Sequence, residues 1–155
     1  MSVDRVDRAI IAELSHDSRL SIRTIAERVH ISRTAANKRV NTLVATGVLL
    51  SFAAQVDRAA IGLGVTALVI VSTSDVSWAD MADALAALPF VERVQAVSGD
   101  IDFVLTVSAP DQQHLSEVIL RQIHAMPGVA STRSHVVLSE REGTRPGTNA
   151  DAWRE

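Results

Sequence analysis

The 155-residue sequence has no cysteine and no tyrosine, and only 3% of its residues are aromatic. Without thiols, disulfide bonds and thiolate metal sites are excluded, which agrees with a reducing cytoplasm. The longest apolar run, residues 65–71, is far shorter than the roughly twenty residues that a membrane span needs. The first residues, MSVDRVDR, lack the apolar core of a secretory signal. We therefore expect a cytoplasmic protein without a membrane span.

The composition is typical of a globular protein, but its charge is unevenly distributed. Apolar residues make up 47% and charged residues 21% of the chain. Residues 1–60 hold nine basic and six acidic side chains, whereas residues 61–155 hold six basic and twelve acidic ones. This asymmetry favours a basic N-terminal part that binds a polyanion and an acidic part with another task.

Residues 21–47 predict two short helices joined by a tight turn. Ser21 precedes one apolar stripe and Ser32 precedes another, and serine oxygens are good N-caps. The first stripe is Ile22, Ile25, Ala26 and Val29, and the second is Ala36, Val40, Leu43 and Val44. Gly47 suits the left-handed conformation that ends a helix. Because only His30 and Ile31 separate the helices, they must cross steeply, as in a helix-turn-helix.

The second of these helices carries a polar face that suits duplex DNA. Arg33, Asn37 and Asn41 recur every four residues, with Thr34 and Lys38 beside them, and such groups bond base edges and phosphates. Residues 18–41 contain six basic side chains and one acid. A merely solvated face is the alternative, but the geometry and charge together favour DNA binding. The residues expected to contact DNA are Arg23, Ser32, Arg33, Thr34, Asn37, Lys38, Arg39 and Asn41.

The remaining N-terminal residues complete a small domain and a connector. Residues 4–15 place apolar side chains at helical spacing behind Asp4, a suitable N-cap. We therefore expect a helix-turn-helix domain over residues 1–47. Residues 48–56, VLLSFAAQV, predict a strand, and residues 57–64, DRAAIGLG, a connector with two glycines. Together residues 48–64 form the expected strand linker and hinge.

Residues 65–139 show a duplicated pattern of strand, helix and strand. Leu88-Pro89-Phe90-Val91 and Met126-Pro127-Gly128-Val129 occupy equivalent places, each with a proline that ends a helix and a valine that opens a strand. Such duplication predicts a ferredoxin-like βαββαβ domain, with both helices on one face of a four-stranded antiparallel sheet. The whole chain is then α+β. The uncovered sheet face predicts a homodimer, and residues 140–155 predict a flexible tail.

These segments together resemble the Lrp/AsnC family, the leucine-responsive or feast/famine bacterial transcription regulators, over residues 3–139. The matching segments are VDRVDRAIIAEL, DSRLSIRTIAERV, ISRTAANKRVNTLVATGVL, DRAAIGLG, VSGDIDFVLTV and MPGVASTRSHVVLSE. The resemblance implies an N-terminal DNA-binding domain and a C-terminal domain that senses a ligand and oligomerises. It also implies that homodimers assemble further into octamers, with an amino acid or related small molecule bound between dimers.

The ligand site implied by the resemblance surrounds the hairpin that begins at Ser98. Gly99 permits a close approach to the backbone, and Asp100 and Asp102 suit an α-ammonium group. Thr132 and Ser134 share one face of the last strand and offer hydroxyls. Ile101 is the remaining residue expected to contact the ligand, and relatives often have an aromatic residue at its position. In the turn of the helix-turn-helix, His30 stands where relatives often have glycine. A simple Gly-Asp turn with solvated acids is the alternative.

Other functions compete with an effector-controlled regulator. A DNA-packaging protein of the same fold would bind DNA without any effector. An enzyme is not expected, because the five histidines lack metal-ligand spacing and we find no nucleophile-base pair, phosphate loop or dinucleotide motif. Neither a metal nor a cofactor is therefore expected.

Overall fold

The chain forms two compact units, each described here by itself. The structure is a computed structural model that describes residues 2–141 and residue 143. One unit holds the described residues up to Gln55 together with residues 141 and 143, and the other holds Val56–Glu140. The expected tail, residues 140–155, lies outside the described residues except at 140, 141 and 143. Among the described helices, none has the length and apolar character to cross a membrane.

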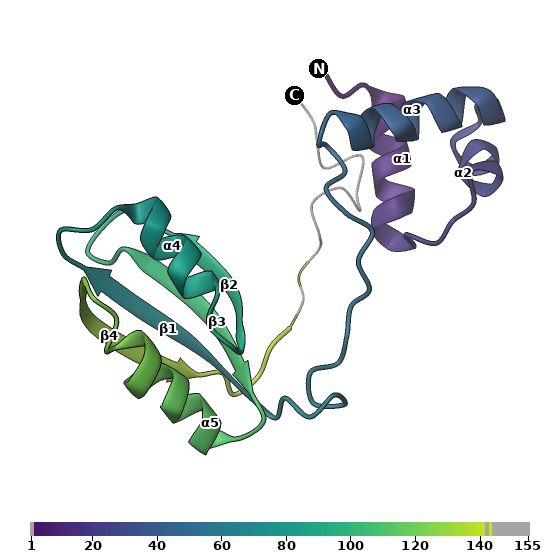
Figure 1. Ribbon diagram of the computed structural model, residues 1–155. Coiled ribbons are helices and arrows are strands. Elements are labelled where there is room, and N and C mark those ends of the chain that lie inside the picture. Colours follow the sequence, from purple (N-terminus) through teal and green to yellow (C-terminus); the bar gives the residue numbers. More distant parts are fainter. Residues whose placement is uncertain (1, 142, 144–155) are drawn as a thin grey trace. The chain divides into compact units, whose positions relative to one another are not determined.

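The described residues of the N-terminal unit form three helices, which can be followed in Figure 1. They are α1 (Arg5–His16), α2 (Ile22–Val29) and α3 (Arg33–Ala45). Each begins after a side-chain cap, because Asp4, Ser21 and Ser32 accept hydrogen bonds from backbone N–H groups three residues on. The caps expected from the sequence are therefore confirmed, and they set where each helix starts.

Apolar side chains from all three helices form one small core. Its buried members are Ile10, Leu14, Ile25, Val40 and Leu43. The turn between α2 and α3 aims these stripes at each other through His30, which has φ 57° and ψ 46°. The backbone N–H of Ile31 then donates to the carbonyl of Ala26 at 3.0 Å. A left-handed residue thus closes α2 and lets α3 start at once in a new direction.

The C-terminal unit contains one antiparallel sheet in the order β2-β3-β1-β4. The strands are β1 (Val65–Thr73), β2 (Val91–Ala96), β3 (Phe103–Ala109) and β4 (Val129–Val136). Helix α4 (Trp78–Ala86) and the helical segment that begins with α5 (Gln112–Ser116) lie on the same face (Figure 1). This is the expected ferredoxin-like arrangement, with the two halves of the sequence duplication interleaved.

Alternation along the strands separates a covered face from an open face. Val69, Val71 and Leu105 are fully buried beneath the helices, whereas Leu68, on the opposite face, is 42% exposed. The row Phe103–Val71–Thr132 crosses three neighbouring strands on the covered face. Phe103 and Val71 thus lie in the core, whereas Thr132 is only partly buried, on the edge strand β4.

The second helical segment differs in type from the regular helix that the sequence predicts. After α5, residues Glu117–Ile123 form a π-helix, η1, in which the N–H of His124 bonds the carbonyl of Ile119 at 3.0 Å. Leu115, Val118 and Ile119 are nevertheless buried, as their spacing indicates. The wider turn lets this apolar stripe meet the sheet, and packing therefore overrides the ordinary helical register.

The strand expected at residues 48–56 is absent from the structure. A strand needs backbone partners on a neighbouring strand, and no described segment pairs with these residues. Instead, the N–H groups of Val48 and Leu49 bond the carbonyl of Leu43 at 2.9 and 3.0 Å, which ends α3. Beyond them, Leu50 is 89% exposed and Phe52 51%. The β-forming composition therefore lacks a partner within one chain.

The connector at residues 57–64 is an ordered turn attached to the C-terminal unit. Arg58 Nε donates to Glu92 at 2.9 Å, and its Nη1 donates to Glu140 Oε2 at 2.9 Å. The Asp57 carboxylate accepts from the N–H of Ala59 at 2.9 Å. These contacts tie the turn to β2 and to the chain beyond β4.

Substitution of His30 tests the left-handed turn. We expect His30→Val to lower the free energy of unfolding by about 1–2 kcal/mol, because a β-branched residue is strained at positive φ. His30→Gly should be neutral or stabilising by less than about 1 kcal/mol, since relief of strain is offset by the greater freedom of glycine when unfolded. Urea denaturation measures both. Equal stability of the two variants would contradict the observed turn geometry.

Candidate functional site

The polar face of α3 is exposed, and no other described residue covers it. We define the reading face as Arg33, Thr34, Asn37, Lys38 and Asn41, all of which are exposed. The opposite face, with Ala36, Val40 and Leu43, is buried. Among the described residues, none forms a hydrogen bond with the side chains of Arg33, Asn37 or Asn41. The structure therefore brings these predicted residues together with their donors and acceptors available.

Arg33 occupies an electrostatically unfavourable position in the free protein. It is the first residue of α3, and the first turn of that helix contains no acid. A cation near a helix N-terminus opposes the helix dipole, at a cost of about 0.3–1 kcal/mol. A bound phosphate or a base acceptor would turn this cost into a favourable contact. The position of Arg33 thus costs the free protein some stability but favours the binding of an anionic partner.

Two further predicted DNA contacts already have partners within the N-terminal unit. The Ser32 hydroxyl accepts from the N–H of Ala35 at 3.2 Å, as the N-cap of α3. Arg23, on α2, donates to Glu27 at 2.9 Å, and this carboxylate raises the pKa of the guanidinium. Ser32 therefore shapes the reading face, while Arg23 lies on an exposed part of a different helix.

Arg39, which the sequence analysis expected to contact DNA, lies apart from the reading face. Its Nη1 donates to Asp4 Oδ2 and to Asp7 Oδ1, each at 2.7 Å. Two residues further along a helix, a side chain points about 160° away, so Arg39 and Asn37 project in nearly opposite directions. The sequence analysis expected a DNA contact because Arg39 is basic, but its observed partners lie more than thirty residues away in the sequence.

The loop between β2 and β3 contains the residues expected to hold a ligand. We define the hairpin loop as residues 97–102. Gly99 has φ +128°, and a Cβ built there would meet nothing within 4 Å. Asp100 is exposed, and its carboxylate bonds no other described residue. The loop thus offers a free carboxylate and an uncrowded backbone beside the half-buried Ile101.

Asp102 has a structural role that the sequence did not reveal. Its Oδ2 accepts from the N–H of Thr73 at 2.7 Å, and its own N–H donates to the carbonyl of Val71 at 3.1 Å. The carboxylate therefore caps the end of β1 and fixes the hairpin loop against it. Of the two acids in the loop, Asp100 is the one left free for a ligand.

Thr132 and Ser134 lie on β4, on the covered face of the sheet. Thr132 pairs with Val71, which in turn pairs with Phe103 at the end of the hairpin loop. Two strand spacings, about 10 Å, therefore separate Thr132 from that end. Ser134 lies two residues further along β4 and is exposed. Only Thr132 is thus in the same row as the loop.

His124 is a neighbour of this region that the sequence did not indicate. Its Nδ1 lies 3.3 Å from Thr132 Oγ1. On the other side of the same row, the ring of Trp78 lies 6.0 Å from that of Phe103. Both residues come from helical segments that cover the sheet, so no local sequence motif links them to the loop. No group of three or more metal-ligating side chains occurs in the described part of the chain.

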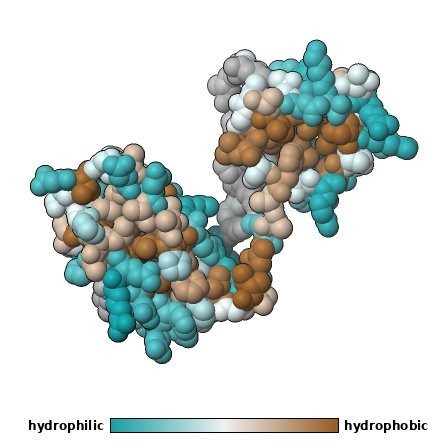
Figure 2. Space-filling view, in the orientation of Figure 1, coloured by the Kyte–Doolittle hydropathy of each residue, from teal (hydrophilic) through white to brown (hydrophobic). Residues whose placement is uncertain are grey.

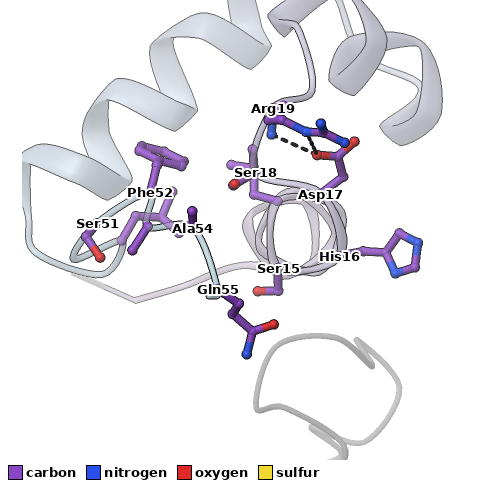
Figure 3. Close-up of a pocket in the computed structure, with 12 residues that line it drawn as sticks. Ser15, His16, Asp17, Ser18, Arg19, Ser51, Phe52, Ala54 and Gln55 are labelled. Atoms are coloured by element: carbon purple, nitrogen blue, oxygen red, sulfur yellow. Dashed lines mark hydrogen bonds and ion pairs between the residues drawn. The ribbon is translucent and has the colours of Figure 1, made fainter. Parts of the chain in front are cut away.

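A cavity of about 750 Å³ lies in the N-terminal unit, away from α3 (Figure 3). It is lined by the end of α1, the loop after it and residues 51–55, including Phe52. Asp17 and Arg19 line it as a bonded pair, with Nε and Oδ1 3.2 Å apart. None of the residues predicted to bind DNA or a ligand lines this cavity. Its charged groups are already partnered, so we assign it no role in either site.

Comparison with known proteins supports both halves of this description. The AsnC-type helix-turn-helix domain matches residues 3–44, and the Lrp/AsnC ligand binding domain matches residues 66–146. The transcriptional regulator AldR from Mycolicibacterium smegmatis is 30% identical, over 93% of this chain and 86% of its own.

Solved structures with similar folds include two that contain L-methionine. A transcriptional regulator from Neisseria meningitidis in complex with L-Met has a TM-score of 0.85 and 26% identity, covering 92% of this chain and 94% of its own. A feast or famine regulatory protein from M. tuberculosis, complexed with L-methionine, has a TM-score of 0.85 and 28% identity, with coverages of 94% and 98%. By these matches, the chain belongs to the Lrp/AsnC family of helix-turn-helix transcription regulators, which is a family of regulators and not of enzymes.

Proposed function

We propose that this regulator binds specific DNA sequences through the reading face of α3 in the cytoplasm. The proposal also includes control by an amino acid or related small molecule, bound at the hairpin loop between dimers. The proposal of DNA binding rests on the side chains of the reading face, which begins at Arg33 and forms no side-chain hydrogen bond with any described residue. The first residues of a recognition helix are those that reach base edges in the major groove.

The hairpin loop is the part of the C-terminal unit that best suits an amino acid. The free Asp100 carboxylate suits an ammonium group, and the open space beside Gly99 admits a close approach to the backbone. Ile101 adds an apolar contact for a side chain. Two structures of similar proteins contain L-methionine, which makes this amino acid the first effector to test.

A homodimer is supported by the apolar side chains that a single chain leaves exposed. Leu68 is 42% exposed on the open sheet face, which it shares with Ile70 and Val104. Apolar surface also follows the connecting segment (Figure 2), where Phe52 and Ile61 are 51% and 61% exposed. A second copy would cover such surface symmetrically. We propose that dimers assemble further, to octamers, and that the effector alters this assembly.

An effector bound between dimers would affect DNA binding through the assembly of those dimers. An effector that binds one assembly more tightly than another shifts the equilibrium between them by its difference in affinity. The alternative is a packaging protein of the same fold, which binds DNA without an effector. Both functions require the reading face of α3 to bind DNA, but only the effector-controlled function requires the hairpin loop to bind a ligand.

The reading face is tested by Arg33→Ala. We expect specific DNA binding to weaken by about 1–3 kcal/mol, because a bidentate base contact is lost. The protein would first select its preferred fragment from a random library, and fluorescence anisotropy would then measure affinity. Arg121→Ala is the matched control, since it removes the same charge from the C-terminal unit. An Arg33 variant with unchanged affinity and sequence preference would refute this reading face.

The ligand site is tested by Asp100→Ala. Calorimetry with each of the twenty amino acids identifies the effector of the wild type. The variant should lose that response, by about tenfold or more in affinity, because a charge-assisted hydrogen bond is lost. DNA binding and thermal stability should stay unchanged. If no amino acid elicits a response from the wild type, the packaging function is favoured instead.

The dimer interface is tested by Leu68→Lys. Burying an unpaired ammonium group costs about 3–5 kcal/mol, so the dimer dissociation constant should rise by a factor of about 100 or more. Analytical ultracentrifugation measures this change. Gln113→Lys adds the same charge at an exposed position on α5 and should leave the assembly intact. A dimer unaffected by Leu68→Lys would place the interface elsewhere.

A further inference from the structure

Three side chains form a single bonded unit, which we call the clamp: Asp4, the N-cap of α1, Asp7 in the first turn of α1, and Arg39 on α3. Asp4 Oδ1 accepts from the N–H of Asp7 at 2.8 Å, and Asp7 Oδ2 accepts from the N–H of Asp4 at 3.2 Å. The second oxygen of each carboxylate accepts from Arg39 Nη1 at 2.7 Å. One guanidinium nitrogen therefore joins the N-terminus of α1 to the middle of α3.

The clamp is anchored by a buried charge. The side chain of Asp7 is 4% exposed, whereas those of Arg39 and Asp4 are 35% and 50% exposed. A buried carboxylate is tolerated only when it is paired and hydrogen-bonded. Since its oxygens bond Arg39 and the N–H of Asp4, loss of Arg39 would leave this charge without its cation. The contact therefore constrains α3 more strongly than a surface ion pair would.

The clamp supplies a directional constraint that the core lacks. Contacts among Ile10, Ile25 and Leu43 are apolar, and burial of apolar surface is favourable in many orientations. Two charge-assisted hydrogen bonds to a planar guanidinium hold only one orientation well. Arg39 projects away from Asn37, so a rotation of α3 that moves the reading face also breaks the clamp.

Both groups with a shifted pKa in the clamp favour its ionised state. The pKa of Asp4 is lowered, chiefly by the N–H of Asp7 and then by Arg39. The pKa of Arg39 is raised, first by Asp7 and then by Asp4. Because protonation of Asp4 begins only below its ordinary pKa, its contribution to stability is present at neutral pH and is lost as the pH falls through this lowered value. At neutral pH, Asp4 and Arg39 are therefore both charged.

We propose that Arg39 is a positioning residue for DNA recognition, which holds α3 in the rotation that presents Arg33 and Asn37 to base edges. This inference rests on the proposed function of α3 and adds a residue that acts without touching DNA. It predicts that Arg39 governs the preference for specific sequences rather than the general attraction to phosphate. The neighbouring Lys38, exposed and without a side-chain hydrogen bond to any described residue, has the opposite role.

The test compares Arg39→Ala with Lys38→Ala on the selected fragment and on a scrambled one. Anisotropy titrations over a range of salt, at a temperature where circular dichroism shows folded protein, give affinities and salt slopes. Arg39→Ala should weaken binding to the selected fragment by about tenfold or more. On the scrambled fragment its affinity should stay within about twofold, with the same salt slope. Lys38→Ala should weaken both and lower the slope by about 0.9.

Asp7→Asn distinguishes positioning from direct contact by the sign of its effect. In a positioning role, loss of the buried charge loosens the clamp and weakens specific binding. Were Arg39 a phosphate ligand, the same variant would release its guanidinium and strengthen binding to both fragments. The double variant Asp7→Asn/Arg39→Ala should bind the selected fragment with the affinity of the weaker-binding single variant and not less, because both substitutions break the same clamp. Should Arg39→Ala fail to fold, Arg39→Lys and Asp7→Asn provide the same comparison.

The possible outcomes separate this inference from the proposed function. If Arg39→Ala lowers the melting temperature but leaves the ratio of specific to non-specific affinity unchanged, Arg39 is only structural and the inference fails alone. If it lowers the salt slope as Lys38→Ala does, Arg39 contacts phosphate and the inference again fails alone. If the wild type selects no fragment at low salt, the proposed reading face fails and the positioning role with it.

Discussion

The orientation of α3 is the constraint on which recognition by this protein depends. One face of the helix must be buried to hold it in place, and the opposite face must stay unbonded to meet DNA. The core satisfies the first demand with Ala36, Val40 and Leu43. Its contacts are non-directional, whereas the hydrogen bonds of Arg39 to Asp4 and Asp7 fix one rotation. Position and rotation therefore have different physical origins.

Local chemistry explains why much of the fold could be predicted from the sequence. Ser21 and Ser32 cap helices through N–H groups three residues away, and His30 takes the left-handed conformation between them. These signals act within a few residues, so the sequence displays them directly. The sheet was equally predictable, because each half carries the same order of apolar strand, helix and proline. Unpaired polar groups on α3 could be located because helical spacing alone places them opposite the core.

What the sequence did not reveal depends on partners far along the chain. Arg39 was expected to contact DNA, yet its partners lie at the N-terminus of α1. Asp102 was expected to hold a ligand, yet one of its oxygens caps β1 at Thr73. The residues after Leu49 have a strand-like composition, but no strand pairs with them among the residues that the structure describes. In each case a side chain or backbone group has several possible partners, and only tertiary packing selects one.

The length of the connecting segment determines how an effector could act on DNA binding. Leu49 packs on the N-terminal core and the turn at Asp57 is tied to the C-terminal unit, which leaves residues 50–56 between them. Seven extended residues span at most about 25 Å. Half-sites for a dimer lie about 34 Å apart. In the proposed dimer, each tether would let an α3 adjust over part of that distance, and the spacing of the C-terminal units would set the rest. An effector that changes their assembly would therefore change which half-site spacings two copies of α3 can reach together.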